Sequence, residues 1–552
     1  MADDDVMDRS IRCEEAAAQI ASSLPHSLYD TAWVRRAEQQ AAAAQGLSLW
    51  QLMQRAGAAA WQWIEQHYPD LRSLVIVCGN GNNGGDGLVL AALAAQAGVR
   101  VSVYMPPFAG QTLVQPAQQA LQAWLAQGGH LLHDLARLDT QADLVVDALL
   151  GIGVRGAVRP DLAKVIQWVN THSMPVLALD IPSGLQADSG TVAGVAVRAK
   201  ATLTLVALKR GLFTGQARDY TGAVYYAALG LDAWLATHSS PWLRLSHTDL
   251  ARYLPARRPC SHKGEHGKVL VLGGELGTGG AVCLAAEAAL RSGAGLVRVL
   301  TRAEHVPVLL IRCPEVMAHV YTPAALQEAL AWADVIACGP GLGQGLWAQE
   351  IVAAVQAAGK PTIWDADALN VLASNPLRFL NQANQAGEHS ADTEPRHRAN
   401  HILTPHPGEA ARLLGCSIAD IEQDRFAAVR QLQQRWGGVV ILKGAGTLIA
   451  DREHIALADV GNPGMASGGS GDVLCGICAA LLAQTLCIYA RQCYDLHNEA
   501  TEGTADPLQD AACAAVLLHG AAADQCALQG MRGMLASDLL PVLRQLGNPN
   551  QK

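Results

Sequence analysis

Short apolar segments alternate with segments of helical periodicity along most of the chain, and this alternation most strongly limits the possible folds. Strands separated by helices predict parallel βαβ units in a doubly wound α/β sheet. In the first half the expected strands are Leu74–Cys78, Val99–Met105, Leu144–Leu150, Val176–Leu179, Leu203–Ala207 and Ala223–Ala228. In the second half they are Lys268–Leu272, Leu296–Leu300, Val335–Cys338, Thr362–Trp364, His401–Leu403 and Val439–Leu442. Ahead of both series, Ser48–Gln66 has helical spacing and is expected to cover one sheet face.

A segment without apolar periodicity separates the two series of strands. It covers Ala236–Arg258 and reaches the cluster Pro255-Ala-Arg-Arg-Pro259. Because 552 residues exceed the ~100–200 residues of a usual single domain, we expect two α/β domains, 1–240 and 241–552. Inside the second, Asn381–Asn400 is polar and poor in apolar residues, which predicts a mobile surface insertion without chemistry.

The charge balance limits the partners of this chain. Lys and Arg number 40 and Asp and Glu number 49, so the formal net charge is −9. This balance argues against a broad basic surface for nucleic acid or an anionic membrane, so neither is an expected partner. The 50% hydrophobic content and 53 glycines exclude a disordered, collagen-like or coiled-coil chain. Any phosphate ligand must therefore be bound by local features.

Three further features bear on the cellular setting. The acidic start, Met1-Ala-Asp-Asp-Asp-Val, lacks the pattern of a secretory signal, so a cytoplasmic location is expected. The 13 cysteines are scattered through apolar runs, which favours reduced core thiols; a redox pair of Cys475 and Cys478 is the minor alternative. The apolar run Val473–Ala490 approaches the length of a membrane span, but Gln484 and Thr485 interrupt it, which favours a buried helix.

A glycine-rich segment follows the first expected strand. Gly79-Asn-Gly-Asn-Asn-Gly-Gly-Asp-Gly87 leads into a helix that is expected to open at Leu88, so backbone N–H groups can bind an anion without a lysine. It contains the dinucleotide pattern GxGxxG, but Val101–Met105 supplies no acid for a ribose. The segment also groups polar side chains: Asn80, Asn82, Asn83 and Asp86. A tight turn that needs glycines for positive φ is the alternative interpretation.

Two further strand ends in the first half carry polar residues. One strand ends with Asp147 and continues into a glycine loop, and another ends with Asp180 and Ser183. In a parallel sheet these loops lie at the carboxyl edge, where ligands bind. Each aspartate alone could be a helix cap. Together with the glycine-rich segment, they favour a binding site.

These residues resemble the epimerase domain of the NAD(P)H-hydrate repair enzymes, from about Leu28 to Leu231. The resemblance rests on Asn82-Asn-Gly-Gly-Asp86, Leu52-Met-Gln-Arg-Ala-Gly57, Asp180-Ile-Pro-Ser-Gly184, the Asp147 strand and Lys209 before Gly211. It implies a Rossmann-like domain in which Asp180 is the acid/base at the hydrated ring, without a redox cofactor. The residues implied to bind the dinucleotide are Asn82, Asn83, Gly84, Gly85, Asp86, Gly151, Ile152, Gly153, Val154, Arg155, Gly156 and Ala157. Those implied to bind a potassium ion are Asn83, Asp147 and Ser183.

A second glycine-rich segment leads into the long apolar helix. Gly461–Asp472 brings backbone amides and a positive helix end next to a carboxylate. Such a loop can stabilise a transferring phosphate, and Asp472 can accept a proton from an attacking hydroxyl. Upstream, Ile441–Thr447 offers Lys443, backbone amides and a hydroxyl to a nucleotide phosphate. The two segments together predict a phosphoryl-transfer site.

Three more expected strand ends in the second half carry polar groups: Gly339–Gly343, Trp364–Leu369 and Thr404–Glu409. His406 lies between two prolines and is rigidly presented, although a lone histidine is often structural. Asp365 and Asp367 could order a phosphate site or an ion, or they could be helix caps.

This set resembles the ribokinase-like fold and, more narrowly, the nucleotide-dependent NAD(P)H-hydrate dehydratases, over about Leu250 to Leu543. The resemblance rests on Thr404–Glu409, Lys443–Thr447 and Gly468–Asp472. It implies that Asp472 deprotonates the C6 hydroxyl, which attacks the terminal phosphate of ADP, with Mg²⁺ present; the sequence itself does not distinguish ADP from ATP. The residues implied for the nucleotide are Lys443, Gly444, Ala445, Gly446, Thr447 and Gly471. Those implied for the hydrated substrate are Ala281, Gly343, His406 and Asp472.

The two resemblances together imply a bifunctional metabolite-repair enzyme and an expected homo-oligomer. One domain would interconvert the R and S forms of hydrated NADH and NADPH (NADHX and NADPHX), and the other would dehydrate the S form, giving NAD(P)H, AMP and phosphate. Two alternatives remain. The second domain could be a kinase for a vitamin alcohol, or the first could be a dinucleotide- or protein-binding module without chemistry, although its intact Asn82–Asp86 segment argues against that.

Overall fold

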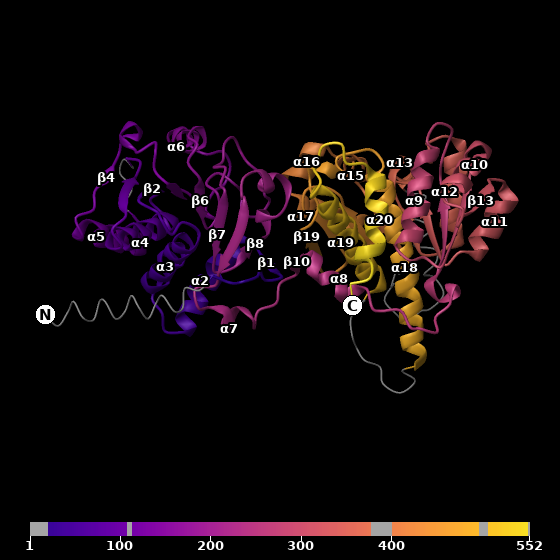
Figure 1. The fold of residues 1–552 in the computed structure, drawn as a ribbon, viewed down its shortest axis with the longest axis horizontal. Helices are drawn as coiled ribbons and strands as arrows, with labels where there is room; N and C mark the ends of the chain where they lie inside the picture. The colour runs from indigo at the N-terminus through magenta and orange to yellow at the C-terminus, as the bar shows by residue number, and fades with distance from the viewer. Residues whose placement is uncertain (1–19, 108–112, 377–399, 496–505, 550–552) are drawn as a thin grey trace. The chain divides into compact units, whose positions relative to one another are not determined.

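The computed structural model describes residues 20–107, 113–376, 400–495 and 506–549 (Figure 1). The chain divides into two compact units, Met1–Leu243 and Arg244–Lys552. This boundary falls inside the aperiodic segment, close to the expected seam.

The first unit is built on a parallel sheet with the strand order β4-β3-β2-β5-β6-β7-β9. In that order the strands are Leu131–Leu132, Arg100–Tyr104, Ser73–Cys78, Leu144–Ala148, Val176–Leu179, Ala201–Leu205 and Ala223–Ala227. Its helices are α2 (Thr31–Ala44), α3 (Leu49–His67), α4 (Asn82–Gln96), α5 (Gln115–Ala126), α6 (Pro160–Thr171) and α7 (Asp232–Leu235). Beside this sheet, β1 (Ser27–Tyr29) pairs with β8 (Leu208–Lys209) and with β10 (Trp242–Leu245).

Helices cover both faces of this sheet, so its central strand β2 is buried on both sides. Leu74 and Ile76 pack in the core that contains α3, α4 and α5, whereas Val75 and Val77 pack in the core that contains α6. A strand that is buried on both faces has no polar positions to alternate with apolar ones. This is why the strand occurs in the sequence as a continuous apolar run.

The second unit has seven neighbouring parallel strands, in the order β13-β12-β11-β14-β15-β16-β17, followed by antiparallel β18 and β19. The strands are Met317–Val320, Leu296–Thr301, Lys268–Leu272, Val335–Cys338, Thr362–Trp364, His401–Leu403, Val439–Leu442, Thr447–Ala450 and Ile455–Ala458. The helices are α8 (Leu250–Tyr253), α9 (Gly279–Arg291), α10 (Val306–Arg312), α11 (Pro323–Trp332), α12 (Leu346–Ala358), α13 (Ala366–Ser374), α15 (Pro407–Leu414), α16 (Ile418–Gln423), α17 (Arg425–Trp436), α18 (Ser470–Asp495), α19 (Pro507–Ala527) and α20 (Ala536–Leu546).

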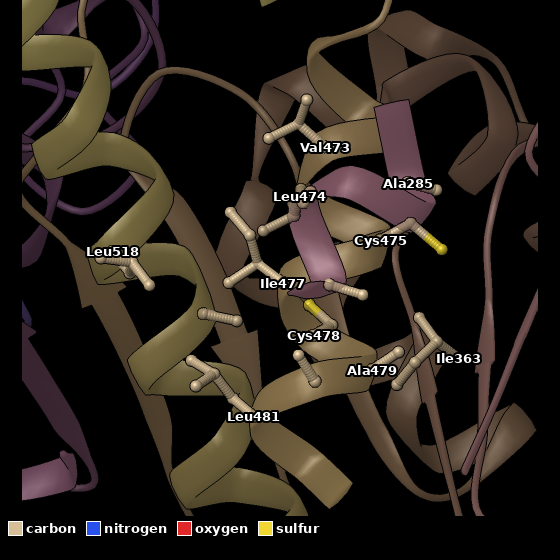
Figure 2. Packing of buried hydrophobic residues seen from close by; sticks show 14 of the residues in the cluster. Ala285, Ile363, Val473, Leu474, Cys475, Ile477, Cys478, Ala479, Leu481 and Leu518 are labelled. Atoms are coloured by element: carbon tan, nitrogen blue, oxygen red, sulfur yellow. The ribbon is translucent and has the colours of Figure 1, made fainter. Parts of the chain in front are cut away.

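The long apolar helix α18 lies in the core of this unit. Its residues Val473–Ala483 are buried against α9 and α19, and Figure 2 shows Cys475 and Cys478 among apolar side chains. Within the described residues, this helix alone has the length and composition to cross a membrane, over Ser470–Arg491, and 61% of its 18-residue apolar window is buried. Its hydrophobicity is therefore used for packing in this unit, as the sequence predicted.

The structure confirms the predicted α/β class with parallel sheets and places a strand at each expected position. It corrects one helix start: α4 begins at Asn82 rather than Leu88, because the glycine-rich segment itself forms the first helical turns. The described cysteines are all free, but Cys260 and Cys416 are exposed rather than in the core. Residues 381–399 of the expected insertion lie outside the described residues.

Candidate functional sites

The first unit contains a cavity of about 550 Å³ at the carboxyl edge of β2, β5 and β6. Of the residues expected to bind a dinucleotide or act on it, those lining it are Asn82, Asn83, Gly84, Asp86, Gly151, Ile152, Gly153, Val154 and Asp180. The expected residues that do not line it are Gly85, Arg155, Gly156 and Ala157. The expected site is therefore assembled in its larger part.

The glycines of α4 are explained by close packing as well as by anion binding. A Cβ at Gly84 would lie 2.0 Å from the carbonyl oxygen of Gly79, and one at Gly85 would lie 2.6 Å from the Met53 side chain. A Cβ at Gly87 would lie 2.7 Å from that of Ala148. The absence of side chains lets the helix N-terminus approach β2 and β5. The first turn of this helix thereby comes to line the cavity.

Asn83, Asp147 and Ser183 form one buried cluster beneath this cavity. The Asp147 carboxylate accepts hydrogen bonds from Ser183 Oγ (2.6 Å) and Ser183 N (2.7 Å), and burial raises its pKa to about 6. Asn83 Nδ2 donates to the Leu150 carbonyl (3.0 Å), whereas Asn83 Oδ1 is buried without a hydrogen-bond partner. An unpartnered buried oxygen is costly, which makes it an open ligand position for a cation. The three residues expected at a potassium site thus lie together.

Asp180 lies at the cavity wall in direct contact with Lys209. Lys209 Nζ donates to Asp180 Oδ1, to Thr204 Oγ1 (3.1 Å) and to the Leu205 carbonyl (2.7 Å), and its side chain is buried. Asp180 has a φ of 64°, in the left-handed region that is unusual for a residue with a side chain. The surrounding contacts therefore fix both the backbone and the carboxylate of this residue.

Glu38 of α2 is a cavity residue that the sequence did not reveal. Its half-buried carboxyl lines the cavity with Asp180 and Asp86. Burial, followed by the negative charge of Asp180, raises the pKa of Glu38 to about 7, and the same two causes raise the pKa of Asp86. An isolated acid on an amphipathic helix resembles an ordinary solvent-facing residue, so no sequence pattern distinguished it.

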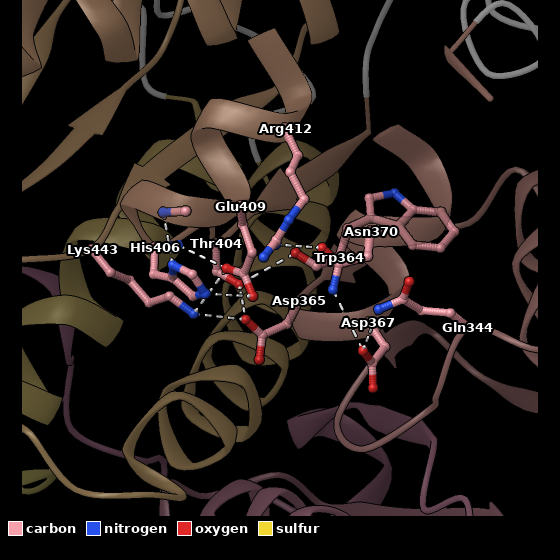
Figure 3. Close-up of polar contacts among 11 residues, drawn as sticks. Gln344, Trp364, Asp365, Asp367, Asn370, Thr404, His406, Glu409, Arg412 and Lys443 are labelled. Atoms are coloured by element: carbon pink, nitrogen blue, oxygen red, sulfur yellow. Dashed lines mark hydrogen bonds and ion pairs between the residues drawn. The ribbon is translucent and has the colours of Figure 1, made fainter. Parts of the chain in front are cut away.

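The second site lies where β14, β15, β16 and β17 end (Figure 3). Lys443 Nζ, after β17, lies 3.0 Å from Asp365 Oδ1, after β15, and 3.8 Å from Glu409 Oε2. Thr404 Oγ1 donates to the same Asp365 oxygen (2.6 Å). The buried carboxylates keep Lys443 charged and raise its pKa. This network holds the ammonium group at the edge where a phosphate was expected.

Asp472 lies in the first turn of α18 beside this network. Burial is the main cause that raises its pKa to about 7, and the negative charges of Asp365 and Asp367 add to the effect. The charge of Lys443 opposes the rise. A carboxyl with a pKa near neutrality can take up a proton during a reaction and release it again. Gly471 lies next to Lys443, since a Cβ there would be 3.4 Å from Nζ.

Two expected substrate residues are held by hydrogen bonds near the strand ends. The Gly343 N–H donates to Asp367 Oδ2 (2.8 Å). His406 is the N-cap of α15, where its Nδ1 accepts from Gly408 N (2.9 Å), and its Nε2 lies 3.4 Å from Glu409. Burial lowers the pKa of His406. The histidine thus has a structural role as a cap, and its side chain is half-exposed.

The expected nucleotide turn, Lys443–Thr447, is held by a residue that the sequence did not reveal. Arg425, buried at the start of α17, donates to the carbonyls of Leu442 (3.2 Å) and Lys443 (3.1 Å) and pairs with Glu422 (2.8 Å). Gly444 has a φ of 144°, and its turn packs against this guanidinium. Ala281, the remaining expected residue, lies in the first turn of α9.

Comparisons with known proteins agree with both halves of this description. Residues 269–545 match the family model described as NAD(P)H-hydrate dehydratase, and residues 50–211 match the model described as YjeF-related protein N-terminus. The bifunctional NAD(P)H-hydrate repair enzyme Nnr of Escherichia coli is 46% identical over 96% of this chain and 95% of its own length. The Vibrio cholerae enzyme of the same name is 43% identical over 95% of this chain and 99% of its own.

Two solved structures are similar to about half of this chain. The ADP/ATP-dependent NAD(P)H-hydrate dehydratase of Bacillus subtilis, co-crystallised with ATP and Mg²⁺, is 28% identical with a TM-score of 0.44, covering 55% of this chain and 98% of that one. A ribokinase-like superfamily protein of Enterococcus faecalis is also 28% identical, with a TM-score of 0.47, over 56% and 97% of the two chains. On the strength of the two full-length relatives and both family models, the chain belongs to the family of bifunctional NAD(P)H-hydrate repair enzymes.

Proposed function

We propose that the first unit interconverts the R and S epimers of NADHX and NADPHX and that the second unit dehydrates the S epimer with ADP. The products of the second reaction are NAD(P)H, AMP and phosphate. The observation that carries the proposal is Asp472, a carboxyl with a pKa of about 7 at a helix N-terminus, next to the charged Lys443. It combines a proton acceptor with an anion-binding environment, as phosphoryl transfer to a hydroxyl requires.

In the second unit Asp472 takes the proton of the substrate C6 hydroxyl. The C6 oxygen then attacks the terminal phosphorus of ADP, and the bond from that phosphorus to the AMP oxygen breaks. Phosphate leaves C6 with the C–O bonding electrons, and loss of a proton from C5 forms the C5–C6 double bond. Lys443 and the α18 N-terminus stabilise the charge on the transferring group.

Mg²⁺ fits this site as a companion of the nucleotide. Among the described residues there is no group of three or more His, Cys, Asp or Glu side chains that could hold a metal ion. Asp365 and Glu409 are already paired with Lys443. Because Mg²⁺ is commonly bound through substrate phosphates and water, ADP would supply most of its ligands here, and the ion would neutralise phosphate charge.

In the first unit Asp180 and Glu38 are the two acid/base groups. C6 of the substrate is a hemiaminal carbon. Protonation of its hydroxyl and loss of water therefore give an iminium ion, and water can add to C6 of this ion from the opposite face. The first step needs a proton donor and the second a proton acceptor. Asp180, paired with Lys209, serves as the acceptor, and Glu38, with its raised pKa, serves as the donor.

Potassium would be bound by Asn83, Asp147 and Ser183, with Asn83 Oδ1 as the ligand position that the fold leaves open. The ion would add positive charge near the substrate phosphates.

We expect KCl, compared with choline chloride at equal ionic strength, to raise the melting temperature of the first unit. Asn83→Ala should remove this difference, whereas Asn80→Ala, in the same loop, should keep it. An equal response of both variants would contradict the assignment.

Reciprocal variants test the two activities. Asp472→Ala should abolish dehydration and spare epimerisation, because Asp472 lies in the second unit only. Asp180→Ala should have the opposite effect. The two proteins serve as controls for each other when epimer ratio and NADH formation are followed by chromatography and absorbance. Loss of both activities in one variant would refute the two-site assignment.

A further inference from the structure

The second unit contains a cavity of about 700 Å³ that shares no lining residue with the dehydration site described above. Its walls are the segment after α8, the end of α9, the second half of α18 and the end of α20. The cluster Pro255-Ala-Arg-Arg-Pro259, which the dehydration site does not use, contributes to its first wall. A volume of this size is typical of small-molecule sites.

The lining of this cavity carries more positive than negative side chains, whereas the chain as a whole has a net negative charge. Five arginines line it and only one acidic residue, Glu265, although acidic residues outnumber basic ones in the whole sequence. The arginines are Arg257, Arg258, Arg291, Arg491 and Arg544. His266, also in the lining, adds no negative charge, and burial lowers its pKa. The cavity is therefore locally cationic.

Arg291 pairs with Glu287 (3.5 Å), which lies outside the lining, and Glu265 cannot neutralise the other four arginines. Glu265 Oε2 already accepts from Arg258 (2.8 Å) and lies 2.9 Å from Arg491 NH1. Arg257 donates to neutral oxygens, the Gly293 carbonyl and Gln484 Oε1 (3.1 Å). Within the part of the chain that the structure describes, Arg544 forms no ion pair with a carboxylate.

Helix ends explain why some of these arginines lie where they do, but they do not explain why the arginines surround a cavity. Arg291 and Arg544 are in the last turns of α9 and α20, where the helix dipole favours a cation. Arg257 belongs to no helix, and its exposed guanidinium donates to two neutral oxygens rather than to a carboxylate. An anionic occupant would use guanidinium donors that the protein leaves without an anion.

Another wall of the cavity is apolar. Leu254, Leu290, Leu481 and Ile488 line it together with Tyr253. A ligand that is only an inorganic ion would leave this wall exposed to water. A phosphate group joined to a planar or apolar moiety would use both parts of the cavity.

From the arginines, the volume and the apolar wall, we propose that this cavity binds a phosphorylated small molecule of nucleotide size at a site separate from the catalytic one. The phosphate contacts Arg257 and Arg544, and the organic moiety packs on the wall with Leu481 and Ile488. The binding does not depend on either catalytic assignment, because none of the residues lining this cavity takes part in them.

Hydrogen–deuterium exchange on the full chain tests the proposal because it reports where a ligand binds. The probes are inorganic pyrophosphate and ADP in parallel. Both should slow exchange at residues 253–266 and 484–491, separately from any protection at 443–447 and 468–472. Protection by ADP at lower concentration than by pyrophosphate would show that the organic moiety adds affinity. An absence of protection at 253–266 with both probes would overturn the proposal.

A pair of double variants with equal charge change controls the experiment. Arg257→Ala/Arg544→Ala should weaken protection at this cavity about tenfold or more, and added KCl should weaken it as well. Arg100→Ala/Arg137→Ala, at exposed positions of the first unit, should leave it unchanged. Arg544→Ala alone replaces the double variant if that protein melts early. If the cavity variants change the oligomeric state without any ligand protection, the cavity is a contact between copies of the chain and the proposal is wrong.

Discussion

Asp472 shows how burial, together with the surrounding charges, sets the protonation of a single carboxyl. Its pKa is raised to about 7, so it is largely protonated in the free enzyme at pH 6 and largely ionised at pH 8. The proposed base must be ionised. We expect kcat/KM for dehydration to rise about tenfold per pH unit below pH 7 and to level off above it. Rate measurements with NADHX from pH 5.5 to 8.5 provide the profile.

Asp367→Asn offers a matched control for this profile. The negative charge of Asp367 raises the pKa of Asp472, so its removal should move the rising part of the profile to lower pH. The asparagine oxygen can still accept the hydrogen bond from Gly343 N, which keeps the loop in place. A profile that stays at the same pH in the variant would contradict the assignment of Asp472 as the titrating base.

Unusual backbone geometry is concentrated at the two sites. Among the described non-glycine residues, those with positive φ are Asp180, Val206, Leu229 and Ala366. The first three line the cavity of the first unit, and Ala366 lies between Asp365 and Asp367. Such conformations cost ~1–3 kcal/mol each and persist where the surroundings impose them. Their positions support the assignment of both sites.

Ala366 allows a test of this strain. With a φ of 47°, its replacement by glycine should release strain that offsets the entropy cost of glycine, so stability should change by less than ~0.5 kcal/mol. Ala354→Gly, inside α12, should cost ~1 kcal/mol. Thermal unfolding of both variants measures the contrast. Equal destabilisation would show that Ala366 is not strained.

At the scale of elements, α18 combines packing and chemistry. Its first turn carries Asp472, and the following residues form the core of the second unit against α9. Gly476 permits the close approach, since a Cβ there would lie 2.1 Å from the Ala285 carbonyl oxygen. The catalytic carboxyl is therefore positioned by a helix that cannot shift without disrupting the core.

Gly476→Ala should destabilise the second unit by about 1–3 kcal/mol, because helix backbones must separate to admit the methyl group. Gly280→Ala is the control, because a Cβ at Gly280 has no other atom within 4 Å. That variant should be neutral or slightly stabilising. The melting temperatures of the two proteins give the comparison, and a similar decrease for both would refute the packing argument.

The strands were the most predictable elements. β11, β14 and β17 have the bounds that the sequence predicted, because strands covered on both faces are continuous apolar runs. The β18–β19 hairpin was not predicted, because its short strands directly follow the Lys443 turn. β4 and β8 have two residues each, too few for any periodicity.

The site was predictable where it follows strand ends and unpredictable where it depends on contacts between distant elements. Asp180 was expected at a site because it follows a strand end, and Asp472 because it ends a glycine-rich segment at the start of a helix. The pairing of Lys443 with Asp365 and the contact of Arg425 with the Lys443 turn depend on three-dimensional packing. Neither leaves a local pattern in the sequence.

At the scale of the whole molecule, one chain combines a reaction that produces an epimer with a reaction that consumes it. The net charge of −9 is compatible with anionic substrates because the groups that we propose to bind anions are local: helix N-termini, glycine-segment amides and Lys443. The cytoplasmic location and the homo-oligomer remain predictions from the sequence. Because the second unit is proposed to use only the S epimer, conversion of the R epimer to NAD(P)H requires both activities.

Incubation of the purified chain with a mixture of R and S NADHX, with and without ADP, tests both assigned reactions at once. With ADP, we expect complete conversion of both epimers to NADH with release of AMP and phosphate. Without ADP, we expect exchange between the epimers and no NADH. Conversion that stops at the share of the S epimer would contradict the epimerase assignment, and no NADH formation with ADP would contradict the dehydratase assignment.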